Sequence, residues 1–159
     1  MGNLSENFNK EQFACQCGQC NKELRISLTL IGILEDLVAF KKLPIKIKKG
    51  YVCGSTQDQA DIVKKNYHAL GKAVDISVEP GKLIETFRYL ETFPEINGLG
   101  INIKENFIHI DLRDKEPIKW VYEGNEYSEL TPALRQKYNL GDNVSKNNIP
   151  APATLEVNI

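Results

Sequence analysis
The chain has 159 residues, of which 42% are hydrophobic, so it is long enough to bury one core in a single domain. Its net charge is -1 and its basic and acidic residues are interspersed, which excludes an extended basic surface and makes nucleic acid an unexpected partner. The polar start and the lack of a long apolar stretch predict neither a signal peptide nor insertion into a membrane.

The first half of the chain predicts one core helix and one edge strand. A helical pattern begins near residue 21, and Pro44 ends it. Its expected buried face consists of Leu24, Leu28, Ile31, Leu34, Leu37 and Val38. Residues 45–52 are predicted to form a strand, in which Ile45 and Ile47 alternate with lysines, as expected for a half-buried strand at a solvated edge. A polar stretch at 57–65 predicts a short surface helix, followed by a loop at 66–71.

The second half mixes strands and helices without a regular β-α-β rhythm. Pro80 suits the start of a helix whose buried stripe is Leu83, Phe87 and Leu90. The predicted strands are 73–78, 99–103, 107–112 and 120–122, and a last short helix is predicted at 132–138. Lys104, Glu105 and Asn106 form the turn of a hairpin. We therefore predict an α+β fold with a mainly antiparallel sheet flanked by helices.

Composition divides the chain into three parts. Residues 1–21 are polar, turn-rich and contain cysteine, and we expect them to pack on the domain formed by residues 22–140. Residues 141–159 are rich in Asn, Pro and Ala, and are expected to form an arm with little core of its own.

Four cysteines are present, three of them close together as Cys15, Cys17 and Cys20, with Cys53 far away in sequence. Their even number fits disulfides, and a four-cysteine zinc site would use the same residues. The spacing Cys-x-Cys-x-x-Cys does not choose between free thiols, disulfides and a structural metal.

Both histidines of the chain lie a few residues from an aspartate, in or just before a predicted strand. In the predicted strand at 107–112, two-residue alternation places His109, Asp111 and Arg113 together on the face opposite the apolar residues. A catalytic zinc usually takes three ligands from histidine and carboxylate groups and leaves a position for water, whose pKa it lowers to about 7. His68, Asp75 and His109 meet this requirement, which indicates metal-assisted hydrolysis.

The motif His-x-x-Gly-x-Ala-x-Asp at 68–75, followed by Gly-x-Gly at 98–100 and His-x-Asp-x-Arg at 109–113, resembles the zinc D-Ala-D-Ala carboxypeptidases and related cell-wall endopeptidases. That family shares its fold with the hedgehog signalling domain, and the resemblance extends from about Phe13 to Tyr122. It implies a hedgehog/DD-peptidase-like fold, one catalytic Zn2+ and the peptide stem of peptidoglycan as substrate. It also implies that the metal ligands are His68, Asp75 and His109.

Two positions depart from the family pattern. Val52 stands where relatives commonly have an arginine that holds substrate, so Lys49 or Arg113 is expected to take that role. Asn106 stands where several relatives have the acidic general base. Asp111 is the preferred replacement because it points to the same side as His109, and its alternative role is to orient a ligand or pair with Arg113.

Three further residues have expected roles near this site. Glu105 is the other candidate base, or else an exposed turn residue, and Tyr51 and Trp120 are expected either to line the cleft or to belong to the core. The family packing would also place Cys53 near the N-terminal cysteines, where a bridge from Cys15 or Cys17 would fit an extracellular working place.

The leading function is therefore a zinc metallopeptidase, a DD- or LD-carboxypeptidase or endopeptidase that cuts peptidoglycan stem peptides. The lack of a visible signal peptide favours cytoplasmic synthesis with action at the cell wall, as for a phage endolysin, or a chain lacking its export signal. One alternative is a zinc-containing binding module of the same fold that has lost hydrolysis. Another is a phage structural or assembly protein that uses the arm at 141–159.

Overall fold

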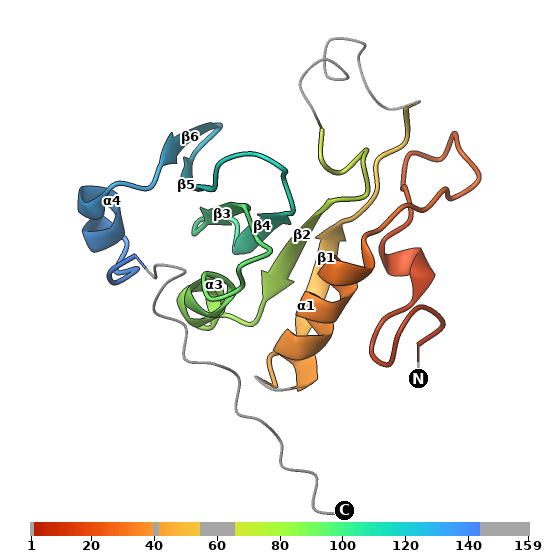
Figure 1. Ribbon diagram of the computed structural model, residues 1–159, viewed down its shortest axis with the longest axis horizontal. Helices are drawn as coiled ribbons and strands as arrows, with labels where there is room; N and C mark the ends of the chain where they lie inside the picture. Colours follow the sequence, from red (N-terminus) through yellow and green to blue (C-terminus); the bar gives the residue numbers. More distant parts are fainter. Residues whose placement is uncertain (1, 40–41, 55–65, 144–159) are drawn as a thin grey trace, which may run out of the picture.

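A six-stranded sheet forms the centre of the protein, and helices cover one of its faces (Figure 1). The computed structural model describes residues 2–39, 42–54 and 66–143. The elements are a short 3-10 helix η1 (Lys10–Gln12), α1 (Leu28–Ala39), β1 (Ile45–Lys49), β2 (Ala73–Val78), α3 (Leu83–Leu90), β3 (Gly98–Asn102), β4 (Phe107–Asp111), β5 (Ile118–Glu123), β6 (Glu126–Glu129) and α4 (Pro132–Lys137). The predicted α+β class is confirmed.

The sheet is mixed, with the strand order β1-β2-β4-β3-β5-β6. β1–β2, β2–β4, β3–β4 and β5–β6 pair antiparallel, whereas β3 and β5 run parallel. β1 lies at one edge with its lysines exposed and its isoleucines half-buried, as the alternation predicts. It ends at Lys49 rather than at residue 52.

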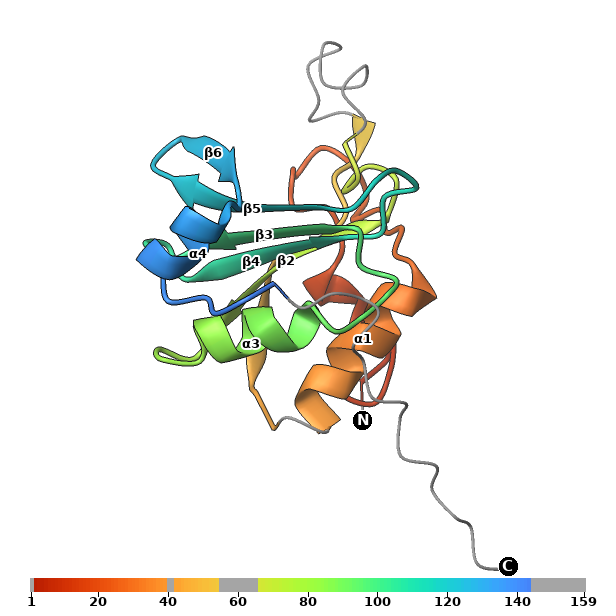
Figure 2. The same cartoon turned by 60° about the vertical axis from the view of Figure 1, so that its left-hand side comes forward.

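The core lies between the sheet and the helices α1 and α3, which Figure 2 shows on the same side of the sheet. Val74 and Ile76 of β2 and Ile108 and Ile110 of β4 are fully buried there. Because successive side chains of a strand point to opposite faces, the alternate residues of β2 and β4 project from the face that the helices leave open.

The core helix begins seven residues later than the apolar pattern indicates. Lys22 adopts a positive φ of 50°, which interrupts a helix, and the amide of Ser27 donates to Gly71 O at 2.8 Å instead of continuing a helical turn. Leu28, expected on the buried face, is 79% exposed. The buried residues of α1 are Leu30, Ile31, Ile33, Leu34 and Leu37.

The last third of the chain adds two elements to the sheet edge. The strand predicted at 120–122 is confirmed and extends to Ile118–Glu123, whereas β6 was not predicted because its sequence is polar and mostly exposed. α4 follows as predicted, with Thr131 as N-cap.

A buried ion pair fastens α4 to the end of α3. Arg135 donates to both carboxylate oxygens of Glu91 at 2.8 and 2.9 Å, and Lys119 of β5 binds the same carboxylate at 2.9 Å. Glu91 is only 4% exposed, so these cations neutralise a charge that would be costly to bury alone.

The helix predicted at 57–65 and the arm from residue 144 onward lie outside the described residues. Within the described ranges, no helix has both the length and the apolar character that a membrane crossing requires.

Candidate metal centre
The open face of the sheet carries the site, because the strand register aligns its residues in a row. Asp75 of β2 lies opposite His109 of β4, His109 lies opposite Gly100 of β3, and Gly100 lies opposite Trp120 of β5. The neighbouring row contains Ala73, Asp111, Gly98 and Ile118 in the same order. Period-two alternation therefore places a carboxylate, an imidazole and an indole side by side on a rigid support.

His68 reaches this row from the turn that precedes β2. Its own amide donates to Asn66 Oδ1 at 3.1 Å, and its carbonyl accepts from the amide of Gly71 at 3.2 Å. The residue is 6% exposed, and its ring centroid lies 5.2 Å from that of His109.

The structure brings His68, Asp75 and His109 together. One ligand atom from each lies within 4.8 Å of the others. Asp75 Oδ1 lies 2.7 Å from His109 Nδ1 and 3.4 Å from His68 Nε2, so it stands between the two rings.

The far nitrogen of each imidazole is held by an acceptor. His68 Nδ1 lies 2.8 Å from Gly50 O, and a carbonyl can only accept, so Nδ1 carries a proton and Nε2 is the nitrogen that faces Asp75. His109 Nε2 lies 3.0 Å from Asp111 Oδ2, which turns Nδ1 to the same point. Such outer partners fix the tautomer and orientation of metal-binding histidines. Two imidazole nitrogens and one carboxylate oxygen are a donor set that fits Zn2+.

The charges of the site depend on one another. Burial alone would raise the pKa of Asp75, but hydrogen bonds to His109 and His68 hold it below its usual range. Burial opposes a charge on His109, yet the hydrogen bonds to Asp111 and Asp75 outweigh it and raise the pKa of His109 to about 9. Burial also opposes the charge on Asp111, and Arg113 with His109 nevertheless lowers its pKa to about 2. Without an ion, the two carboxylates are thus balanced by His109 and Arg113, and a bound cation would take the place of the proton on His109 Nδ1.

The Gly-x-Gly motif makes room for two of these side chains. A Cβ atom on Gly98 would lie 2.2 Å from the carboxylate of Asp111, and one on Gly100 would lie 2.4 Å from the indole of Trp120. The glycines therefore let Asp111 and Trp120 pack over β3 beside His109, whose ring centroid is 5.3 Å from that of Trp120.

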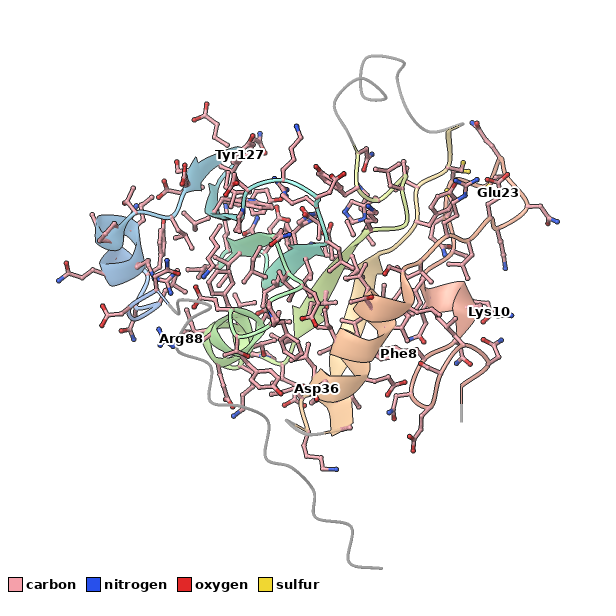
Figure 3. All side chains as sticks on the ribbon, in the orientation of Figure 1. Phe8, Lys10, Glu23, Asp36, Arg88 and Tyr127 are labelled. Atoms are coloured by element: carbon pink, nitrogen blue, oxygen red, sulfur yellow. The ribbon has the colours of Figure 1, made fainter. Side chains whose placement is uncertain are left out.

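A pocket of about 280 Å³ opens beside the histidines. Its lining includes His68, His109, Asp111, Arg113 and four aromatic residues, Tyr67, Trp120, Tyr122 and Tyr127. In Figure 3, Tyr127 lies on the β6 side of the sheet, away from Arg88 of α3 and Asp36 of α1. The pocket thus lies over the face that α1 and α3 do not cover.

Arg113 and Asp111 form a two-point ion pair in this pocket. Arg113 Nε lies 2.8 Å from Asp111 Oδ1, and Nη2 lies 2.6 Å from Oδ2. The guanidinium group stands 5.0 Å from the ring of Tyr67 and 5.3 Å from that of Trp120. Asp111 is fully buried and projects with His109 and Arg113 from one face, as alternation predicts.

The other expected site residues lie elsewhere. Glu105 stays in the hairpin turn, where its exposed side chain pairs with Lys48 at 3.5 Å. Lys49 lies at the end of β1 opposite Asp75 and is exposed. Asn106 has a positive φ of 52° and donates to Val78 O at 2.7 Å, so the hairpin turn accounts for an asparagine at this position.

Sequence reasoning left Trp120 open between the cleft and the core, and it lines the pocket; three tyrosines of the pocket were missed. Tyr122 follows Trp120 by two residues and therefore shares its face of β5, which was a usable signal. Tyr67 and Tyr127 reach the pocket through a turn and through β6, and nothing local in the sequence marks them. Tyr51, the other aromatic residue expected near the cleft, packs against Cys15 and Cys53 instead.

Two imidazoles and a carboxylate with fixed outer partners, next to an open pocket, are the arrangement of a metallopeptidase. Residues 6–111 match the family model described as Peptidase M15, which is more than half of the chain. The chain therefore belongs to the peptidase M15 family of zinc D-Ala-D-Ala carboxypeptidase-like metallopeptidases. No curated protein and no solved structure gives a significant match to this chain.

Proposed function
We propose that the protein is a zinc-dependent DD- or LD-peptidase that hydrolyses peptide bonds in peptidoglycan stem peptides. His68, Asp75 and His109 are the proposed ligands of one catalytic Zn2+. The single observation that carries the proposal is the convergence of His68 Nε2, His109 Nδ1 and Asp75 Oδ1, with Gly50 O and Asp111 holding the far nitrogens.

Bound zinc would supply Lewis acidity and a nucleophile at neutral pH. The chain's own residues prepare this chemistry. Gly50 O fixes the tautomer of His68, and Asp111 draws His109 Nε2 away from the centre so that Nδ1 faces it. The indole of Trp120 packs beside the ring of His109, with the ring centroids 5.3 Å apart.

Asp111 is proposed as a positioning residue. Its two oxygens already bind Arg113 and His109, and its side chain is fully buried, so it is poorly placed to take a proton from an incoming nucleophile. The alternative, in which Asp111 is the general base, predicts a different response to zinc. If Asp111 acts through His109, excess zinc should restore turnover to Asp111→Asn; if it is the base, turnover should stay low.

Arg113 is proposed to bind the substrate in place of the arginine absent at Val52. The pair with Asp111 uses Nε and Nη2, which leaves Nη1 as the nitrogen for a carboxylate or a developing oxyanion. Tyr67 and Trp120 hold the guanidinium plane in place from the sides. Glu105 is the second candidate base, and Glu105→Gln should leave turnover unchanged if its pair with Lys48 is its only role.

A second function is favoured by one observation. Asn106 occupies the position of an acidic residue in several relatives, and here it serves the turn through its bond to Val78 O. A zinc-containing module that binds stem peptides without cutting them would have this substitution.

The proposal includes a fold and a working place. The mixed sheet with helices on one face is compatible with the hedgehog/DD-peptidase fold, and we assign the peptidase domain to residues 22–140, with the N-terminal segment packed on it. The working place is the cell wall.

The test combines zinc analysis with product analysis. Purified protein is expected to carry zinc at this centre and to release fragments from defined stem peptides ending in D-Ala-D-Ala, identified by mass spectrometry. His109→Ala should lose both the zinc of this centre and the turnover.

Glu95→Ala, at an exposed turn position, is the matched control and should retain both. Zinc bound at His68, Asp75 and His109 without any cleavage of stem peptides would favour the binding module. A wild-type protein that takes up no zinc at this centre would overturn both functions.

A further inference from the structure
A second cluster of metal-ligand type lies outside the centre described above. Cys15, Cys17 and Cys20 come from the loop after η1, and Cys53 follows β1. The four Sγ atoms all lie within 4.8 Å of one another. Cys15 and Cys53 are buried, and Cys17 and Cys20 are half-buried.

The spacing of the sulfurs suits a shared cation. Cys17 Sγ lies 3.5 Å from Cys20 Sγ and 3.6 Å from Cys53 Sγ. A tetrahedral zinc site with Zn–S bonds of about 2.3 Å places its sulfurs about 3.8 Å apart. A disulfide requires an S–S separation of about 2.05 Å, so neither of the two measured pairs has the spacing of a bridge.

Backbone amides point at two of these sulfurs. The amides of Gln19 and Cys20 both donate to Cys17 Sγ at 3.3 Å, and the amide of Cys53 donates to Cys15 Sγ at 3.4 Å. Donors of this kind stabilise negative charge on sulfur, and thiolate is the form that binds a metal. The loop therefore presents its thiols in the way that a metal site requires.

We propose that Cys15, Cys17, Cys20 and Cys53 bind one structural Zn2+ with four sulfur ligands. Each thiol gives its proton to solvent as its sulfur bonds to the ion, and no electron is transferred. Four protein ligands close the coordination sphere, so this site has no open position for substrate. It is distinct from the catalytic centre, and its existence does not depend on the proposed peptidase activity.

The site would join the N-terminal segment to the residues that follow β1, where the Gly50 carbonyl binds His68. Two hydrogen bonds lie close to these cysteines in the chain: the amide of Tyr51 donates to Phe13 O at 2.7 Å, and Gly50 O accepts from His68 Nδ1 at 2.8 Å. Gly50 lies three residues before Cys53, so an ion that holds Cys53 in place also restrains the Gly50 carbonyl that orients His68. The structural site acts as a positioning device for the catalytic one.

The decisive experiment measures zinc at the cysteine site in a variant that keeps all four cysteines and lacks the histidines of the other centre. The double variant His68→Ala/His109→Ala, expressed in zinc-supplemented medium and purified with a reductant, is expected to retain about one zinc per chain, as structural sites bind tightly. X-ray absorption at the zinc edge should show four sulfur neighbours at about 2.3 Å. Cobalt substitution should give intense sulfur-to-cobalt charge-transfer absorption.

Three outcomes overturn the site: a metal-free double variant with four alkylatable thiols, a pair of disulfides that persists under these conditions, or iron in place of zinc. Circular dichroism verifies that the double variant is folded. Because the readouts are metal content and spectra, failure here leaves the peptidase proposal intact. A peptidase that fails to cut stem peptides equally leaves this site intact.

The positioning role has a separate test. Cys20→Ser should lose the cysteine-bound zinc and weaken zinc binding at the His68 centre by about ten- to a hundredfold, the usual effect of losing an outer support. Cys20→His, which supplies another zinc ligand, should restore both. Competition with a chelator measures the affinity. Unchanged affinity at the His68 centre after loss of the cysteine zinc would reject the positioning role.

Discussion
The two metal-ligand clusters of this protein are built in opposite ways. His68, Asp75 and His109 stand mainly on paired strands, offer nitrogen and oxygen, and border an open pocket. The four cysteines lie in loops and offer only sulfur, and their Sγ atoms face one another around a shared point. A sheet holds ligands in place without the ion and leaves one side open to substrate, whereas loops need the ion to hold them together. The comparison supports the proposed catalytic role of the first cluster and the proposed structural role of the second.

Acidification should separate the two sites by the largest factor. Each proton released on metal binding makes affinity fall about tenfold per pH unit. The backbone amides of Cys20 and Gln19 lower the pKa of Cys17 to about 6, so binding by all four thiolates should release about three protons at neutral pH rather than four. The raised pKa of His109, about 9 without metal, means that the other centre releases about one proton from this ring. From pH 7 to 6, we expect zinc affinity to fall about a thousandfold at the cysteines and about tenfold through His109. Titration calorimetry in buffers of different ionisation enthalpy measures the number of protons released per zinc bound. Equal numbers at the two centres would contradict the predicted difference in their pH dependence.

Asp111→Ala should damage the sheet-held centre alone. The change leaves the partly buried Arg113 and His109 Nε2 without their acceptor, so the free energy of unfolding should fall by about 3 kcal/mol. Zinc affinity of that centre should fall about ten- to a hundredfold. Urea unfolding and chelator competition measure the two effects. Zinc bound by the cysteines should remain, and its loss together with the first zinc would mean that the variant damages the whole fold and not this centre.

Gly100→Ala should disturb the same centre through packing. The added methyl group would lie 2.4 Å from the indole of Trp120, and overpacking of this kind costs about 1–3 kcal/mol. Displaced Trp120 should move away from His109 and weaken zinc binding there. Thermal unfolding and zinc affinity are the measurements, and a variant as stable as the wild type with unaltered zinc binding would show that the glycine row does not shape the site.

Gly32→Ala should have the smallest effect, and of the opposite sign. Gly32 lies in α1 with open space where its Cβ would be, so alanine should stabilise the helix by about 0.5–1 kcal/mol. Neither metal cluster should change. This variant is therefore the glycine-to-alanine control for Gly100→Ala, and destabilisation here would mean that the helix face is more crowded than it is in the structure.

The sequence was most informative where structure is local and periodic. Two-residue alternation predicted the hairpin, the buried isoleucines of β4 and the shared face of His109 and Asp111. The candidate ligands His68, Asp75 and His109 were chosen by residue type, by order and by the family resemblance, and the structure places their nitrogen and oxygen atoms together.

What the sequence did not reveal depends on distant contacts. The carbonyl of Gly50 behind His68 has no sequence signal, because any residue has a carbonyl. The parallel pairing of β3 with β5 brings Trp120 beside Gly100 across a non-local register. The late start of α1 follows from a bond between Ser27 and Gly71, which the apolar spacing cannot reveal.

The buried ion pairs of Glu91 with Arg135 and Lys119 limit how far this protein can be shortened. The Peptidase M15 match ends at residue 111, yet both cations that neutralise the Glu91 carboxylate, Lys119 and Arg135, come later in the chain. A fragment trimmed to the matched segment would lack β5 and so expose the edge of β3. It would also leave the buried carboxylate of Glu91 without its two cations. We therefore expect the smallest stretch able to fold to include Arg135 and to extend well beyond the segment matched by the family model.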